Sequence, residues 1–258
     1  MSTESRRLSI LSASEIDDLY AMPRFTDEER QLYFDLSEAE RAAAGAIRTA
    51  SVAVHLILQL GYFKAKRQFF LYEFAQVADD IAYILERYFP GRDIASVKMI
   101  SKPTRLEQHQ TILALFNYRS CDSAAKADLE RKTERIAMLS TQPLYILREA
   151  LQYLSQLRII APPYRFMQEM VGRVVAGERK RVSELLNRAI TPDVEALLDT
   201  LLRADERLYR ITALKHEAKD FSYKELRREV ERRKFFQPLY EFMRTFLAKA
   251  GLSAESGK

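Results

Sequence analysis

Pairs of residues that can cap helices recur along this sequence, and they constrain the fold more than any other feature. In each pair a Ser or Thr is followed three residues later by a Glu, and both side chains can accept hydrogen bonds from the free amides of a helix start. Four pairs have this spacing: Thr26/Glu29, Ser37/Glu40, Thr104/Glu107 and Ser222/Glu225. Thr191 followed by Pro192 indicates one further start. The chain is therefore expected to form many separate helices.

Residues that interrupt helices are scarce. The 258 residues include 7 Gly and 8 Pro, and long stretches are rich in Ala, Leu, Glu, Arg and Lys. This composition favours helices over strands, and we predict an all-α, multi-helical fold. The expected helices span residues 14–21, 27–34, 38–64, 71–88, 105–117, 123–139, 144–157, 164–189, 192–203, 205–218, 223–236 and 238–250.

Charge is distributed unevenly along the chain. Residues 1–97 hold 11 Lys and Arg against 15 Asp and Glu, whereas residues 98–258 hold 30 against 21. The change coincides with Pro, Gly and Ser punctuation between residues 90 and 104, which is typical of a linker. We expect an N-terminal helical subdomain at 1–97, a second helical subdomain at 98–203, a helical linker segment at 204–252 and a disordered tail at 253–258. The basic part fits a polyanion partner, or equally an ordinary basic protein.

Several function classes find no support in the residues. No apolar run approaches the ~18 residues of a membrane span, the start lacks the apolar core of a signal peptide, and the single Cys121 excludes an intramolecular disulfide. We expect a soluble, cytoplasmic protein without membrane contact. The chain has neither zinc-ligand spacing nor a P-loop, Rossmann or nucleophile-elbow motif. Catalytic residues, metals and cofactors are therefore not expected in this chain, and the adjacent Asp79 and Asp80 are interpreted as surface residues.

Two helices carry polar faces that suit DNA. The first helix carries a polar stripe at helical spacing, which comprises Arg48, Ser51, His55, Gln59 and Tyr62. Such a stripe suits base edges or phosphates in a DNA groove, or else it faces solvent or another domain. The cations Lys64, Lys66 and Arg67 follow at the end of this helix. Those cations can also simply complement the helix dipole. The second is residues 164–189, which follow a predicted helix and the connector 159–164 in a helix-turn-helix-like arrangement.

This second helix is the preferred recognition helix. Its expected buried stripe is Met167, Met170, Val171, Val174, Val182 and Leu185, and its opposite side carries Arg165, Gln168, Arg173, Arg179 and Lys180. Gly172 and Ala176 lie on that polar side, where small side chains would let the backbone approach a phosphate chain. An amphipathic surface helix with a charged outer face is the alternative interpretation.

Other charged positions are weaker candidates. Lys98, Lys102 and Arg105 flank the expected helix start at Thr104, where free amides favour anions. His109 shares a face with apolar residues and is interpreted as a satisfied core histidine. The basic cluster in residues 227–234 is interleaved with Glu at salt-bridge spacing, which indicates a solvated face.

Blocks of residues along most of the chain resemble a known family. They include the run from Leu60 to Phe70 (LGYFKAKRQFF), then Asp80-Ile81, Arg87-Tyr88-Phe89-Pro90, Thr104-Arg105-Leu106, Tyr118-Arg119, Arg158-Ile159, Ala161-Pro162 and Lys219-Asp220-Phe221-Ser222. From about Phe25 to Ser253 the chain resembles the N-terminal region of replicative transposases of the Tn-three family. One departure is Pro163, where that family often has glycine.

The resemblance implies sequence-specific binding of double-stranded DNA at the terminal inverted repeats of a transposon. In that family a later RNase H-like domain holds the metal-binding Asp, Asp, Glu triad, so divalent metal is expected only there. We expect two successive helix-turn-helix-like DNA-binding subdomains followed by a helical C-terminal segment, in a fragment, a truncated product or one half of a split transposase. The alternative is a helical assembly module or a truncated regulator, which self-associates or pairs with a catalytic transposase chain.

Overall fold

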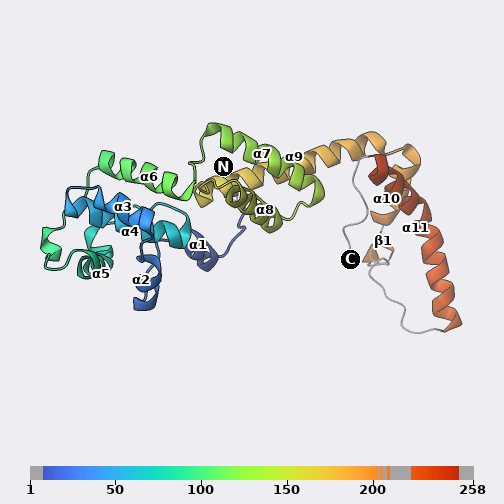
Figure 1. Ribbon diagram of the computed structural model, residues 1–258. Helices are drawn as coiled ribbons and strands as arrows, with labels where there is room; N and C mark the ends of the chain where they lie inside the picture. The colour runs from blue at the N-terminus through green and yellow to red at the C-terminus, as the bar shows by residue number, and fades with distance from the viewer. Residues whose placement is uncertain (1–7, 203, 206–207, 210–221, 250–258) are drawn as a thin grey trace, which may run out of the picture. The chain divides into compact units, whose positions relative to one another are not determined.

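The computed structural model describes residues 8–202, 204–205, 208–209 and 222–249 of the chain (Figure 1). The predicted all-α class is confirmed, because the described residues are helical apart from loops, an isolated bridge and one pair of two-residue strands. The chain divides into two compact units, Met1–Val175 and Ala176–Lys258. The boundaries expected at 97/98 and 203/204 stay predictions.

The first unit contains the helices up to the first half of α9. Their bounds are α1 Ala13–Tyr20, α2 Asp27–Tyr33, α3 Glu38–Gly45, α4 Ala50–Lys66, the 3₁₀ turn η1 Phe74–Gln76, α5 Ala78–Tyr88, η2 Ile94–Ser96, α6 Lys102–Phe116, α7 Ser123–Leu139, α8 Pro143–Gln156 and α9 Tyr164–Ala189. The second unit continues with α10 Pro192–Leu202, the antiparallel strands β1 Ala204–Asp205 and β2 Leu208–Tyr209, and α11 Tyr223–Lys249.

Capping explains most of the helix starts. The capping boxes at Thr26/Glu29 and Ser37/Glu40 are both formed, and a further one occurs at Ser12/Glu15. The box expected at Thr104 is wrong: Ser101 caps α6 and accepts a hydrogen bond from the Thr104 amide, because Pro103 fits the first turn of a helix.

Four other expectations differ from the structure. The helix expected at 38–64 is two helices, since α3 ends at Gly45 and α4 begins after Thr49. The helix expected at 71–88 begins only at Ala78, after η1. The helices expected at 223–236 and 238–250 form the single helix α11 with Pro238 inside it. Of the helix expected at 205–218, Leu208–Tyr209 is a strand, and most of the rest lies outside the described residues.

The first of two apolar clusters in the first unit surrounds α4. Residues 53–63 of α4 are all buried, and α2, α3, α5 and α6 supply neighbours such as Phe34, Ile81, Ile84 and Ile112 (Figure 1). A fully buried helix needs apolar residues on every side. Gly61 is required in this helix, because a Cβ added there would lie 2.3 Å from Cε1 of Phe34.

The second cluster is formed by α7, α8 and α9 (Figure 1). Met167, Met170, Val171 and Val174 of α9 are buried in it, as expected, with Leu129 of α7 and others. The N-terminal segment also joins this cluster: Leu11 is buried there and its amide donates to the Tyr164 hydroxyl at 3.2 Å. Residues 8–20 therefore pack with helices that lie more than a hundred positions later.

The second unit carries paired charges on its helices. Glu178 is buried and accepts two hydrogen bonds from Arg181, each of 2.7 Å. On α11, the expected salt bridges are present at Arg227–Glu231, Arg228–Glu225 and Arg232–Glu229. The basic cluster at 227–234 therefore neutralises much of its own charge, as its spacing indicated.

Candidate nucleic-acid interface

Most of the expected polar stripe on α4 does not face solvent, although Arg48, just before the helix, is exposed. His55, Gln59 and Tyr62 are buried, with exposed fractions of 0, 3 and 2%. His55 lies between the Tyr72 hydroxyl, 2.9 Å from Nδ1, and the Lys98 carbonyl, 3.1 Å from Nε2. Burial lowers its pKa. The ring is therefore neutral, with Nε2 donating to the carbonyl and Nδ1 accepting from the hydroxyl.

Gln59 and Tyr62 also have partners inside the protein. The Gln59 amide donates to Gln108 of α6. The Tyr62 hydroxyl donates to Asp80 at 2.6 Å, and Arg30 donates to the same carboxylate at 2.8 Å. Asp80 is thus a buried member of a network, and its interpretation as a surface residue is wrong. We leave His55 and Gln59 out of the proposed DNA-contacting set, because both side chains are buried in the core. The Gln59 Oε1 atom is buried as well and has no hydrogen-bond partner among the described residues.

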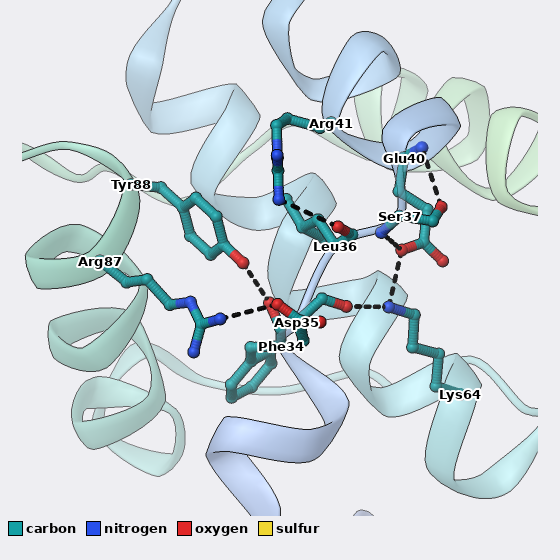
Figure 2. Close-up of polar contacts among 9 residues, drawn as sticks. All are labelled: Phe34, Asp35, Leu36, Ser37, Glu40, Arg41, Lys64, Arg87 and Tyr88. Atoms are coloured by element: carbon teal, nitrogen blue, oxygen red, sulfur yellow. Dashed lines mark hydrogen bonds and ion pairs between the residues drawn. The ribbon is translucent and has the colours of Figure 1, made fainter.

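Lys64 holds the loop between α2 and α3 rather than extending into solvent (Figure 2). Its ammonium lies 2.7 Å from the Glu40 carboxylate and also donates to the Asp35 carbonyl. The Lys64 and Glu40 side chains are 18 and 7% exposed. Arg87 reaches Asp35 from α5 at 2.7 Å. A cation held this way has little charge left to offer DNA.

The next two cations of α4 differ from each other. Lys66 is half-buried and donates to the Asp18 carbonyl at the end of α1. Arg67 is exposed and adopts a left-handed conformation with φ of 54° that ends α4. Its guanidinium carbon lies 5.3 Å from the centre of the Phe116 ring. Of the three cations at this helix end, Arg67 alone is both exposed and without a carboxylate or carbonyl partner among the described residues.

The residues expected to bind anions at the start of α6 differ in their exposure. Ser51 exchanges two hydrogen bonds with the Lys98 backbone, at 2.8 and 2.9 Å, so this serine positions the loop before α6. Lys98, Lys102 and Arg48 are exposed, and Arg105 is half-buried.

His109 lies against Phe69, with ring centres 3.8 Å apart and planes within 8°. Burial and the charge of Arg105 lower its pKa to about 4. Its Nε2 has no hydrogen-bond partner among the described residues, so His109 is a stacked histidine rather than the expected satisfied one.

The expected recognition helix presents basic residues in its first half. Arg165 pairs with Glu169 at 3.0 Å and Arg173 with Glu130 of α7 at 2.9 Å. These arginine side chains are 71 and 56% exposed, which leaves both pairs in water. Exposed pairs of this kind contribute little, about 0–1 kcal/mol. Both arginines can therefore exchange their carboxylate for another anion at small cost.

Two further features of α9 bear on that face. The Gln168 amide donates to the Leu8 carbonyl at 2.9 Å, so the N-terminal segment occupies one of its donors. A Cβ added at Gly172 would meet no heavy atom within 4 Å beyond the adjacent helix backbone. The backbone at Gly172 is thus open to close approach, as the sequence indicated.

Arg179 and Lys180 belong to the part of α9 in the second unit. Both are exposed, and Lys180 lies 3.9 Å from Glu184. Their role in binding stays a prediction.

Sequence reasoning missed two exposed arginines in the connectors. Arg119 precedes α7 and Arg158 follows α8, and the two loops pair through an isolated parallel bridge between Arg119 and Ile159. Single arginines in loops carry no periodic signal, although both positions lie in the blocks that suggested the family resemblance.

The described residues lack the features of two other kinds of site. They bring together no group of three or more His, Cys, Asp or Glu that could hold a metal ion. Within the same ranges, each helix is too short or too polar to cross a membrane. Cys121 is half-buried, and burial raises the pKa of its thiol.

Comparison with known proteins identifies one family. A search of curated proteins found no match. A family model described as "Domain of unknown function (DUF4158)" matches residues 10–174, which is more than half of the chain and nearly coincides with the first compact unit. The chain therefore belongs to the DUF4158 family, and residues 10–174 form its characteristic domain.

Proposed function

We propose that this chain binds double-stranded DNA in a sequence-specific manner, at the terminal inverted repeats of a transposon, as the recognition part of a replicative transposition apparatus. The resemblance to transposases of the Tn-three family supports this proposal, and the DUF4158 family is found in transposase-associated proteins. The structural observation that carries it is the exposed face of α9 within the first unit, between Arg165 and Arg173.

The residues of this face support binding in a DNA groove. Arg165 and Arg173 are eight residues apart, about 12 Å along the helix axis, and a major groove, about 12 Å wide, admits an α-helix. Gly172 lies beside Arg173 and leaves the backbone open. An arginine can pair with guanine through two hydrogen bonds or bind a phosphate. The exposed carboxylates of Glu169 and Glu130 hold the arginines only weakly.

We propose further that this chain recognises DNA without cutting it. Strand cleavage would belong to the metal-binding catalytic domain of the apparatus, in the same polypeptide or in a partner chain. An assay for nicking of supercoiled DNA with Mg²⁺ or Mn²⁺ should therefore show no cleavage by this chain. Metal-dependent cleavage that follows the protein through purification would refute this part of the proposal.

The test of recognition is selection from a pool of duplexes with a random 20-base-pair centre, followed by anisotropy measurements. The chain should enrich a single motif and bind it at least ten times more tightly than a scrambled duplex of the same length. Gly172→Leu introduces a good helix former, so the helix should be retained. This variant should weaken binding to the motif at least tenfold, because the leucine side chain keeps the DNA away from the helix backbone. Equal binding to selected and scrambled duplexes would refute sequence-specific recognition.

A matched control is available on the same helix. A Cβ at Gly177 would also meet no heavy atom within 4 Å, and this residue lies in the second unit. Gly177→Leu makes the same chemical change five positions later, about 140° further around the helix. It should leave binding within threefold of the wild type. Equal losses from both variants would mean that the face near Gly172 has no special role.

A second candidate function is favoured by the surface of α11. Large apolar side chains are exposed at helical spacing on it: Tyr223, Leu226, Val230 and Tyr240. Exposed apolar stripes are typical of protein-protein contacts. An assembly module would self-associate through such a stripe. Light scattering separates the two functions, because a stable dimer that binds no DNA at 50 mM salt would support assembly and refute recognition.

A further inference from the structure

We propose that Arg67, Arg119 and Arg158 form a binding site for the phosphodiester backbone of double-stranded DNA; this arginine cluster lies where the ends of α4, α6 and α8 meet. The inference rests on the proposed function and deepens it. It adds a sequence-independent anchor that is separate from the face of α9.

The backbone brings these three arginines together. Arg67 ends α4, Asn117 ends α6 and Arg158 follows α8, and they are the non-glycine residues of the described chain with positive φ, at 54, 53 and 52°. The connectors after α6 and α8 then pair: the Arg119 amide donates to the Arg158 carbonyl at 2.9 Å, and the Ile160 amide donates to the Arg119 carbonyl at 3.0 Å. Three helix ends are thereby fixed at one place on the surface.

Phe116 links two of the guanidinium groups directly. The Arg67 guanidinium lies over the Phe116 ring, at 5.3 Å from its centre, and over the Tyr118 ring at 5.9 Å. Arg158 donates from Nη1 to the Phe116 carbonyl at 3.3 Å. Aromatic faces orient a guanidinium while leaving its N–H edge free. Arg67 therefore presents an intact edge, and Arg158 has spent one of its five donors.

The charges of this cluster are not neutralised locally. All three arginines are exposed, and none forms an ion pair with a carboxylate in the described part of the chain. Asp122, three residues after Arg119, accepts from the Ala125 amide at 2.8 Å as the cap of α7. By contrast Arg87, Arg165 and Arg173 each have an acidic partner. The cluster is thus a local excess of positive charge.

The unused donors of these arginines indicate a polyanionic ligand. Arginine near a helix C-terminus commonly only stabilises the exposed carbonyls, and Arg158 does so for one of them. That role leaves the Arg67 edge and the remaining Arg158 donors unexplained. The guanidinium groups of Arg67 and Arg158 are held in place by Phe116, and the backbone bridge places exposed Arg119 beside Arg158. Such a group of exposed arginines matches successive phosphates of a nucleic-acid strand, which accept paired hydrogen bonds.

The test compares two triple variants by anisotropy on a scrambled 30-base-pair duplex between 50 and 200 mM salt. One variant is Arg67→Gln/Arg119→Gln/Arg158→Gln. The control, Arg92→Gln/Arg135→Gln/Arg148→Gln, removes three exposed arginines of the same unit that also lack ion pairs in the described residues. Each phosphate contact contributes about 0.9 to the slope of log K against log salt. The cluster variant should therefore lower the slope by roughly 2 to 3, and the control by less than 1.

The same loss of affinity is expected on selected and scrambled duplexes, because phosphate contacts carry no sequence information. Equal slopes for the two variants, with intact wild-type binding, would overturn the cluster and leave the proposed function standing. Wild-type binding that is equally tight on both duplexes, with a reduced slope for the cluster variant, would support the cluster and refute specific recognition. A wild type that binds neither duplex at 50 mM salt would overturn both.

Circular dichroism at 222 nm checks that each variant is folded. If the cluster variant unfolds, Arg119→Gln alone replaces it, with Arg135→Gln as its control. Arg119 has an ordinary backbone conformation, so its replacement disturbs no left-handed helix end. The slope should then fall by about 0.9 for Arg119→Gln alone, and an unchanged slope would overturn the inference.

Discussion

Replacing Gly61 by Ala should destabilise the first unit, although Ala is the better helix former. The added Cβ would lie 2.3 and 2.4 Å from two carbons of the Phe34 ring, roughly 1 Å closer than an ordinary contact. Phe34 is fully buried, and its ring packs edge-on against Phe25 at 5.4 Å. The ring therefore has no free space into which it can move.

The magnitude follows from two opposing terms. Ala gains about 1 kcal/mol of helix propensity over Gly, whereas overpacking a close-packed core costs about 1–3 kcal/mol. A clash with a fully buried aromatic ring belongs at the upper end of that range. We expect the free energy of unfolding to fall by about 2 kcal/mol.

Gly172→Ala is the matched control. Gly172 also lies in the middle of a helix, α9, but a Cβ added there would meet no heavy atom within 4 Å beyond the adjacent helix backbone. It should raise the free energy of unfolding by about 0.5–1 kcal/mol. Urea unfolding of the full chain, followed by the near-ultraviolet circular dichroism of its tyrosines, measures both changes. The opposite signs are the essential result. A Gly61→Ala variant that is as stable as the wild type, or more stable, would refute the reasoning.

Three further predictions concern charges. Asp80→Ala should lower the free energy of unfolding by about 3–5 kcal/mol, because it leaves the buried partners of this carboxylate without their acceptor. The control Asp79→Ala, at an exposed neighbouring position, should change the free energy of unfolding by less than about 1 kcal/mol. Equal urea midpoints for the two variants would contradict this prediction. The folded-state pKa of His109 is lowered to about 4, so its contribution is present above pH 6.5 and is lost as the pH falls towards 4. His109→Phe should therefore lose less stability than the wild type between pH 7 and 4.5, and identical pH profiles would count against it. Glu130→Gln frees Arg173 and should tighten DNA binding and steepen its salt dependence in anisotropy titrations; unchanged binding would argue against contact by Arg173.

Local signals in the sequence predicted the helices well. The expected range of α7 agrees at both ends with the structure, and so does that of α9, because caps and apolar periodicity act within a few residues. The break between α3 and α4 was missed, although Gly45 and Thr49 mark it. The apolar pattern continues across the residues between α3 and α4, and it masked the weaker signals for a helix end there.

The candidate site was harder to predict, because exposure depends on residues far away in the chain. The spacing of His55 and Gln59 correctly placed them on one face of α4, but it could not show that Tyr72 and Gln108 cover that face. Gly172 was predictable, since a small residue between polar ones on a surface helix is a local pattern. The arginine cluster was not, because its members belong to three separate helix ends.

The hydrogen bond between Leu11 and Tyr164 spans 153 positions of the chain and has a consequence for how this protein folds. The buried residues of the first apolar cluster end at Leu113 in α6, so most of this cluster can form once that helix has been synthesised, and Ile160 packs against it later. The second cluster must wait for α9 and then bind a segment made more than a hundred residues earlier. Contacts of such long range slow folding, because the intervening loop must close first. A version of the protein that starts after residue 20 should therefore keep its first cluster and lose cooperativity in its second.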